Sequence, residues 1–387
     1  MIPWSSQSCE SSDCGQESNL QHYQPNSSPS LILNTQHQCI ATLKSPNAYI
    51  SSMVLSGKFF FTGSSDNEIC LWCRDLFSSE LGQESPVYNM CAPGKGAVKC
   101  LLVSSDKIFS AHQDHKIRVW RIDMDETENA KFSHLVTLPK LSDRAMKFLV
   151  PKNHVEIRRH KKATWVHHVD SVSSLALSND ESLMYSVSWD RTIKIWRTND
   201  FKCLESISKA HDDAINAIVI TIDGCVYTGS ADKKIKVWKK HSEETKHCLV
   251  ATLNGHSFGI NALALSTDES QLYSGHSDGA IVVWGRSNYS NMVVSGALLG
   301  HRKSILCLAV ANDLLCSGSA DKTVKIWRPL EGLYSCLVSL EGHNGPVKCL
   351  AVTNDHHKPK DSVSSYLIYS GSLDYEMKVW QVVVPNF

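Results

Sequence analysis

Short apolar runs separated by turn residues recur along most of the chain. A typical pair of runs flanks an aspartate, as in Leu-Tyr-Ser-Gly-His-Ser-Asp-Gly-Ala-Ile-Val-Val-Trp at residues 272–284. β-Branched and aromatic residues on both sides of the aspartate predict two strands joined by a tight turn. Aspartate suits such a turn because its carboxylate accepts hydrogen bonds from nearby backbone N–H groups. The pattern therefore predicts an all-β chain.

The strand pair recurs seven times, with the same kinds of residue at three positions. Each copy ends in a tryptophan, has an aspartate six residues earlier, and has a hydroxyl residue four residues before the aspartate. The hydroxyl residues are Thr62, Ser110, Ser186, Thr228, Ser274, Ser317 and Ser370. The aspartates are Asp66, Asp114, Asp190, Asp232, Asp278, Asp321 and Asp374, and the tryptophans are Trp72, Trp120, Trp196, Trp238, Trp284, Trp327 and Trp380.

A histidine stands four residues before a further apolar run in five copies: His168, His211, His256, His301 and His343. Pro46 and Gly94 occupy that place in the first two copies. This arrangement resembles the WD40 family over about residues 38–387. The resemblance implies a buried hydrogen-bonded network of histidine, hydroxyl, aspartate and tryptophan in each blade, and shorter or water-completed networks in the first two blades. A hydrolase triad is excluded, because an enzyme needs one activated serine rather than seven.

The period predicts a seven-bladed β-propeller. Most intervals between the tryptophans are close to the ~40–45 residues of one four-stranded blade. The long interval between Trp120 and Trp196 lacks a further aspartate, because Arg159 stands six residues before Trp165. It is therefore interpreted as an insertion rather than an eighth blade. Only Gln-Val-Val-Val-Pro-Asn-Phe follows Trp380, so we expect residues 38–44 to complete the last blade and close the ring.

Two features of the sequence narrow the range of functions. The residue after each blade tryptophan is never aspartate, and Trp189-Asp190 lies in a turn, which weakens the alternative of a ubiquitin-ligase substrate receptor. The segments QCIATLK, YISSMVLSGKFFFTGSSDNEICLW and RRHKKATW resemble the plant JINGUBANG-like WD-repeat proteins. That resemblance implies a regulatory interaction protein without enzymatic activity.

Composition adds few constraints. Lys+Arg and Asp+Glu both number 39, so no overall charge favours nucleic acid or membrane. The absence of a long apolar run or secretory signal leads us to expect a cytoplasmic or nuclear protein. Most of the 14 cysteines stand singly in apolar runs and are expected to be reduced. No cofactor, metal or small-molecule substrate is predicted, and residues 1–37, rich in Ser, Gln and Asn, are expected to be a disordered leader.

The insertion at residues 141–168 between blades two and three is basic. It contains Arg158, Arg159, Lys161 and Lys162. A solvated loop is the favoured interpretation. The alternatives are a nuclear-import signal or a patch that binds an anionic partner, either nucleic acid or lipid. Nucleic acid is less favoured, because no aromatic residues alternate with the charges.

One face of the ring is the candidate partner site. Residues just before the turn aspartates and in the loops after the histidines should meet on one face. The candidates are Trp189, Asp213, Phe258, Arg302, Lys303 and Leu373. Aromatic and arginine side chains concentrate interface energy. The sequence therefore favours a monomeric, non-enzymatic scaffold or adaptor that binds other proteins.

Overall fold

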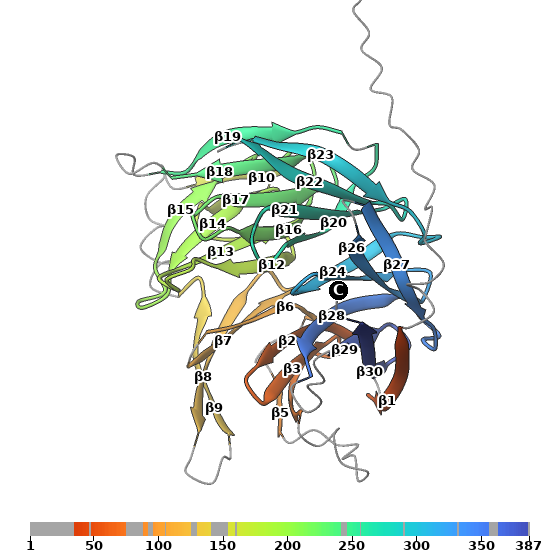
Figure 1. Ribbon diagram of the computed structural model, residues 1–387. Helices are drawn as coiled ribbons and strands as arrows, with labels where there is room; N and C mark the ends of the chain where they lie inside the picture. Colours follow the sequence, from red (N-terminus) through yellow and green to blue (C-terminus); the bar gives the residue numbers. More distant parts are fainter. Residues whose placement is uncertain are drawn as a thin grey trace, which may run out of the picture.

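The computed structural model describes residues 35–45, 48–74, 88–91, 96–104, 106–124, 130–140, 154–158, 161–240, 246–255, 257–288, 291–330, 333–355 and 363–385. The described residues form seven four-stranded antiparallel sheets and one two-stranded hairpin, without helices. The sheets are arranged as blades around an axis (Figure 1). The predicted fold, a seven-bladed β-propeller, is confirmed.

The blades follow one another along the chain. Blade one contains β2 (Ile50–Ser56), β3 (Phe59–Ser64), β4 (Glu68–Cys73) and β5 (Tyr88–Cys91). Blade two contains β6 (Val98–Val103), β7 (Lys107–His112), β8 (Ile117–Met124) and β9 (Ala130–Leu138). Blade three contains β12 (Val172–Leu177), β13 (Leu183–Ser188), β14 (Ile193–Arg197) and β15 (Cys203–Ile207). Blade four contains β16 (Ile215–Ile220), β17 (Val226–Ser230), β18 (Ile235–Lys239) and β19 (Cys248–Leu253).

The remaining blades complete the circle. Blade five contains β20 (Ile260–Leu265), β21 (Gln271–His276), β22 (Ile281–Asn288) and β23 (Asn291–Leu298). Blade six contains β24 (Ile305–Ala311), β25 (Leu314–Ser319), β26 (Val324–Leu330) and β27 (Leu333–Leu340). Blade seven contains β28 (Val347–Asn354), β29 (Val363–Ser372), β30 (Glu376–Pro385) and β1 (Gln36–Lys44). The first strand of each blade contacts the first strand of the next, and β28 contacts β2.

Strand β1 closes the ring in the predicted way. It pairs antiparallel with β30 and brings Gln38 opposite Gln381 and Leu43 opposite Met377. Leu43 is buried in a cluster with Met377, Ile50 and Trp72, so this one strand contributes to the contact between blades seven and one. Pairing β1 with β30 covers a strand edge that would otherwise stay open to other chains.

The turn between the second and third strands is the same in every blade. The residue after each turn aspartate has a positive φ, between 67° and 95°. These residues are Asn67, His115, Arg191, Lys233, Gly279, Lys322 and Tyr375. The left-handed conformation is costly for residues other than Gly and Asn. In six blades the aspartate stabilises this conformation by accepting the backbone N–H two residues later, as Asp232 Oδ1 does from Lys234 at 3.0 Å.

The insertion contains a hairpin. The sequence favours a loop at residues 141–168, but β10 (His154–Arg158) and β11 (Lys161–Thr164) pair as a separate two-stranded sheet, with Arg158 opposite Lys161. Val155 and Ile157 alternate with polar residues, which is the period of a strand. Arg159 and the side chains of Arg158, Lys161 and Lys162 lie outside the described residues.

Candidate functional site

The same buried network of hydrogen bonds occurs within each of four blades. In blade four, the Trp238 indole N–H donates to Thr228 Oγ1 at 3.0 Å, Thr228 Oγ1 lies 2.8 Å from His211 Nε2, and His211 Nδ1 lies 2.8 Å from Asp232 Oδ2. The same groups meet in blades three, six and seven. The residues are His168, Ser186, Asp190, Trp196, His301, Ser317, Asp321, Trp327, His343, Ser370, Asp374 and Trp380.

The proton positions in this network follow from its carboxylate. An ionised carboxylate only accepts, so histidine Nδ1 donates to it, and histidine Nε2 is left to accept the hydroxyl proton. Burial lowers the pKa of His168, His301 and His343, so these imidazoles stay neutral at neutral pH. Burial alone would raise the pKa of Asp232, but hydrogen bonds from His211 and from backbone N–H groups lower it to about 2. The hydroxyl oxygen therefore accepts the indole N–H and its proton is donated to the imidazole. With both bonds made, the group acts as a structural brace.

Blade two differs from the expectation. The sequence predicts a network without histidine there, but His112 Nε2 lies 2.9 Å from Ser110 Oγ, and the Trp120 indole donates to the same oxygen at 3.2 Å. Asp114 instead pairs with the buried Arg118, at 2.6 Å. His112 stands on the strand itself, two residues after the hydroxyl, and burial lowers its pKa to about 4.

Blade five uses the same variation. Ser274 Oγ accepts the Trp284 indole at 3.0 Å and lies 3.1 Å from His276 Nε2. The sequence assigned this role to His256, which lies outside the described residues. Asp278 accepts the backbone N–H of Ala280 at 3.0 Å. A histidine two residues after the hydroxyl is the sequence signal that would have identified both His112 and His276.

Blade one has the shortest described network. The Trp72 indole donates to Thr62 Oγ1 at 2.8 Å, and Ser64 Oγ donates to the Asp66 carboxylate. Asp66 also accepts the backbone N–H of Glu68 at 3.4 Å. Pro46, at the place of the histidine, lies outside the described residues. The expected shortening of this network therefore stays a prediction.

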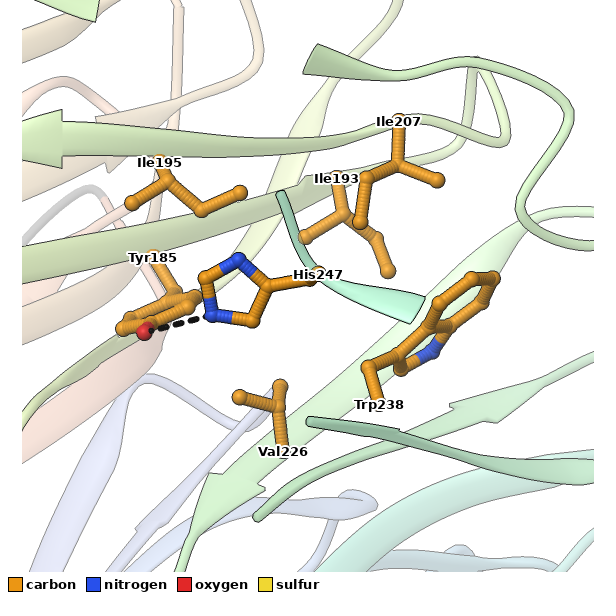
Figure 2. A pocket seen from close by; sticks show the side chains of 7 residues that line it. All are labelled: Tyr185, Ile193, Ile195, Ile207, Val226, Trp238 and His247. Carbon is orange, nitrogen blue, oxygen red and sulfur yellow. Dashed lines mark hydrogen bonds between the residues drawn. The ribbon is translucent and has the colours of Figure 1, made fainter. Parts of the chain in front are cut away.

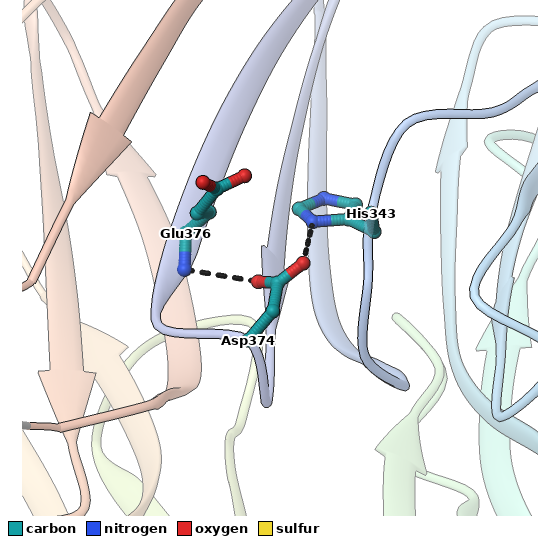
Figure 3. A group of neighbouring side chains, drawn as sticks. All are labelled: His343, Asp374 and Glu376. Carbon is teal, nitrogen blue, oxygen red and sulfur yellow. Dashed lines mark hydrogen bonds and ion pairs between the residues drawn. The ribbon is translucent and has the colours of Figure 1, made fainter.

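One group of side chains in the described part of the chain has the spacing of metal ligands. Nitrogen and oxygen atoms of His343, Asp374 and Glu376 lie within 4.8 Å of one another (Figure 3). Each atom has another partner: His343 bonds to Asp374 and Ser370, and Glu376 pairs with Lys44 at 3.1 Å and with Lys378 at 3.0 Å. The group is the blade-seven network together with a neighbouring ion pair.

A buried polar contact joins blades three and four. His247 Nδ1 lies 2.8 Å from Glu205 Oε2, and His247 Nε2 lies 3.1 Å from the Tyr185 hydroxyl. The apolar gap beside it, lined by Ile193, Trp238 and others, has no room for a water molecule (Figure 2). Burial and the charge of Glu205 raise the pKa of Tyr185 to about 12. Tyr185 therefore stays protonated and serves as a hydrogen-bonding contact between blades. This contact was not predicted from the sequence.

The candidate partner residues lie at one end of the strands. Trp189 and Leu373 stand in turns before the aspartates, and Asp213, Phe258, Arg302 and Lys303 stand in the loops before the first strands. The turn aspartates connect the turns to the loops. For example, Asp321 Oδ2 in a turn accepts the backbone N–H of Arg302 in a loop at 2.9 Å. We call this end, formed by the two sets of loops, the turn face.

Large apolar side chains are exposed on the turn face. Trp189 is 40% exposed, Phe258 is 48% exposed and Leu373 is 38% exposed. The side chains of Asp213, Arg302 and Lys303 are also exposed. Tyr375, which was not predicted from the sequence, is 48% exposed beside Asp374. Trp189, Leu373 and Tyr375 stand on turns fixed by the hydrogen bonds of Asp190 and Asp374, so a partner would meet a preformed surface there.

Other described features do not suggest a reactive site. The described cysteines are free thiols, and burial raises the pKa of Cys349 to about 12, which disfavours its reactive thiolate. No helix among the described residues is long and apolar enough to cross a membrane.

Three curated relatives align with part of the chain. Zinc finger CCCH domain-containing protein 62 of Arabidopsis thaliana is 29% identical over 163 residues, which cover 41% of this chain and 37% of that protein. Protein ROOT INITIATION DEFECTIVE 3 of Arabidopsis thaliana is 30% identical, covering 49% of this chain and 46% of that protein. An uncharacterized WD repeat-containing protein of Schizosaccharomyces pombe is 26% identical, covering 42% and 45%. The chain thus matches less than half of the length of each relative.

The family comparison covers most of the ring. The family described as WD domain, G-beta repeat matches residues 37–73, 159–197, 201–239, 247–285, 292–328 and 334–381. The first match runs from β1 into blade one, so the family repeat is offset by one strand from the blade. Blade two is not matched, although it has four strands and the Ser110–Trp120 bond. The chain belongs to the WD40 repeat family.

Proposed function

We propose that this chain is a non-enzymatic scaffold that holds a protein partner on its turn face. WD40 propellers are typically interaction scaffolds, and the residues of this ring that resemble catalytic groups bond to one another inside the blades. The observation that carries the proposal is the exposure of Trp189, at 40%, in a fixed turn. Small or polar residues occupy the same position in most other blades: Ser65, Gln113, Ala231, Ser277 and Ala320.

The surroundings of Trp189 support a binding role. Asp190 accepts the backbone N–H of Thr192 at 3.0 Å and so fixes the turn that carries the tryptophan. The ammonium of Lys99 lies 5.6 Å from the centroid of the Trp189 ring. A rigid aromatic group loses little conformational entropy when it is buried by a partner. Trp189 therefore fits the role of an interface anchor.

The sequence resemblance to the JINGUBANG-like proteins supports a regulatory role in a plant. We also propose that the scaffold acts in the cytoplasm or the nucleus. Fold alone does not determine the partner.

Affinity capture with surface variants tests the proposal. The tagged chain and its Trp189→Ala/Phe258→Ala/Arg302→Ala variant are used to capture proteins from plant tissue, and each captured protein is tested again in purified form. We expect the variant to bind the partner at least about thirtyfold more weakly, because anchors of this kind contribute about 2 kcal/mol or more each. An unchanged thermal melt of the variant shows that its fold is intact.

The control is an apolar residue at the opposite end of the strands. Ile222 is 68% exposed in the turn between β16 and β17. Ile222→Ala should leave partner binding unchanged. Loss of binding in Ile222→Ala, with full binding in the triple variant, would move the site to the other face and contradict the proposal.

A further inference from the structure

The first strand of every blade carries a β-bulge at its second residue. The register shifts between the first and third residues of β2, β6, β12, β16, β20, β24 and β28. Bulges redirect a side chain at the rim of a sheet. The seven bulged residues are Ser51, Lys99, Ser173, Asn216, Asn261, Leu306 and Lys348. They form a ring around the axis, at the turn-face end of the first strands.

Four of the bulged residues join neighbouring blades. Ser173 Oγ donates to the backbone oxygen of Ile215 at 2.5 Å, Asn216 to that of Ile260 at 2.8 Å, and Asn261 to that of Ile305 at 2.9 Å. Ser51 donates in the same way to Val98. In each case the acceptor is the first residue of the next blade's first strand. A small polar residue at the bulge therefore has a structural role.

Lys99 and Lys348 depart from this role. No hydrogen bond to the next blade and no ion pair is found for either ammonium within the described ranges. Lys99 lies over the Trp189 ring instead. Burial lowers the pKa of Lys99, and the positive charge of Lys348, on blade seven, lowers it further. Like charges without a counter-ion are destabilising, and a bound anion would remove that cost.

The ring of bulged residues carries positive charge. Lys99 and Lys348 are the charged members of the seven bulged residues. Around them the turn face has charges of both signs: Arg191, Arg302 and Lys322 lie in its loops, and so do the seven turn aspartates and the exposed Asp213. An acidic segment would therefore find its complementary charge at the ring of bulged residues.

We propose that Lys99, Lys348 and Trp189 bind a carboxylate-rich segment of a partner protein. This inference rests on the proposed function and specifies the chemistry of the partner. An extended acidic segment can place carboxylates beside the half-buried ammonium groups while its other atoms pack on the exposed part of the indole ring. A nucleic acid is disfavoured, because strand binding requires several stacking aromatics along a row of cations, and Trp189 is one aromatic residue beside two recessed lysines.

The test uses a short fluorescein-labelled peptide of Glu, Asp and Gly. Its matched neutral peptide contains Gln and Asn in place of the acids, and binding is measured by fluorescence anisotropy. The main variant is Lys99→Ser/Lys348→Ser, because serine is the residue that joins the blades at positions 51 and 173. This variant should fold with an unchanged or higher melting temperature. We expect it to bind the acidic peptide more than about tenfold more weakly.

The matched control is Lys202→Ser/Lys240→Ser. Both lysines are exposed at the opposite end of the strands, so the control removes the same charge from the other face. It should bind the acidic peptide as the wild-type chain does, and Trp189→Ala should bind it more weakly. The neutral peptide should not bind, and salt should weaken binding of the acidic peptide.

Three results would overturn the inference. They are no binding of the acidic peptide by the wild-type chain, equal weakening in both lysine pairs, and tighter binding of oligothymidylate with the same dependence on Lys99 and Lys348. If partner capture is still lost in the Trp189→Ala/Phe258→Ala/Arg302→Ala variant while the acidic peptide does not bind, the scaffold proposal stands and this inference fails. If capture is also unchanged in that variant, both fail.

Discussion

At the scale of residues, a buried hydroxyl group in each blade accepts a hydrogen bond from the tryptophan indole. In blade four, Thr228 contacts both the Trp238 indole and the His211 imidazole, whereas in blade one Thr62 contacts the Trp72 indole. Both threonine side chains are buried, at 0% and 1% exposure. A buried N–H group that loses its partner costs about 1–3 kcal/mol. Comparing the two blades therefore measures how much the contact between hydroxyl and histidine adds to the stability of the fold.

Thr228→Val and Thr62→Val remove the hydroxyl while keeping the volume of the side chain. We expect Thr228→Val to lower the free energy of unfolding by about 1–2 kcal/mol more than Thr62→Val, because it disconnects an imidazole as well as an indole. Urea unfolding followed by tryptophan fluorescence measures both variants. Equal losses in the two blades would show that the histidine adds nothing to the brace.

The sequence reveals those residues that repeat at fixed spacing. A hydroxyl residue, Asp and Trp recur in every copy, so their positions could be read without a structure. His112 and His276 were not assigned, because they reach the hydroxyl from the same strand and have a spacing of their own, two residues after the hydroxyl. The role proposed for Lys99 and Lys348 could not be predicted from the sequence. It depends on the bulges, which place both lysines at the position where Ser51 and Asn216 hydrogen-bond to the next blade.

At the scale of elements, β1 closes the ring. It comes from the start of the chain and supplies the outer strand of blade seven. Gln38 Nε2 donates to Gln381 Oε1 at 2.8 Å across this pairing. The closure was predicted because the last repeat lacks a fourth strand and residues 38–44 form a strand that belongs to no other repeat. The β10–β11 hairpin was not predicted, because two short strands with many charged residues resemble a loop in sequence.

A disulfide placed across β1 and β30 tests the closure and its register. In a Cys39→Ser background, Gln38→Cys/Gln381→Cys should oxidise readily and raise the melting temperature, because paired residues of antiparallel strands have Cα separations suited to a disulfide. Such a bond also closes a long loop in the unfolded chain, which stabilises the native state by a few kcal/mol in the chain-entropy account. Peptide mapping by mass spectrometry identifies the bond.

The control shifts the pairing by one residue. His37 is paired with Val382, and neighbouring residues on a strand point to opposite faces. His37→Cys/Gln381→Cys should therefore oxidise poorly and give no rise in melting temperature. Equal oxidation of both pairs would mean that β1 does not hold a fixed register on β30.

At the scale of the whole molecule, the ring gathers the candidate binding residues on one face. The turn face combines the exposed Trp189, Phe258 and Tyr375 with Lys99 and Lys348 at the bulges. The sequence totals could not show this grouping, because the 39 basic and 39 acidic residues cancel. It follows from the strand order, which brings the bulges and the aspartate turns of all seven blades to the same end of the strands. Association on the turn face should therefore depend on salt.

We propose that partners bind on the turn face, while the repeated hydroxyl, histidine, aspartate and tryptophan groups only brace the blades. Amide hydrogen exchange of the chain, alone and with a captured partner, tests this proposal most directly. We expect slower exchange on binding at residues 96–100, 187–192, 300–304 and 343–348, with unchanged exchange in the turns at 178–182, 221–225 and 266–270. Protection confined to those latter turns, or to the outer strands, would contradict the account.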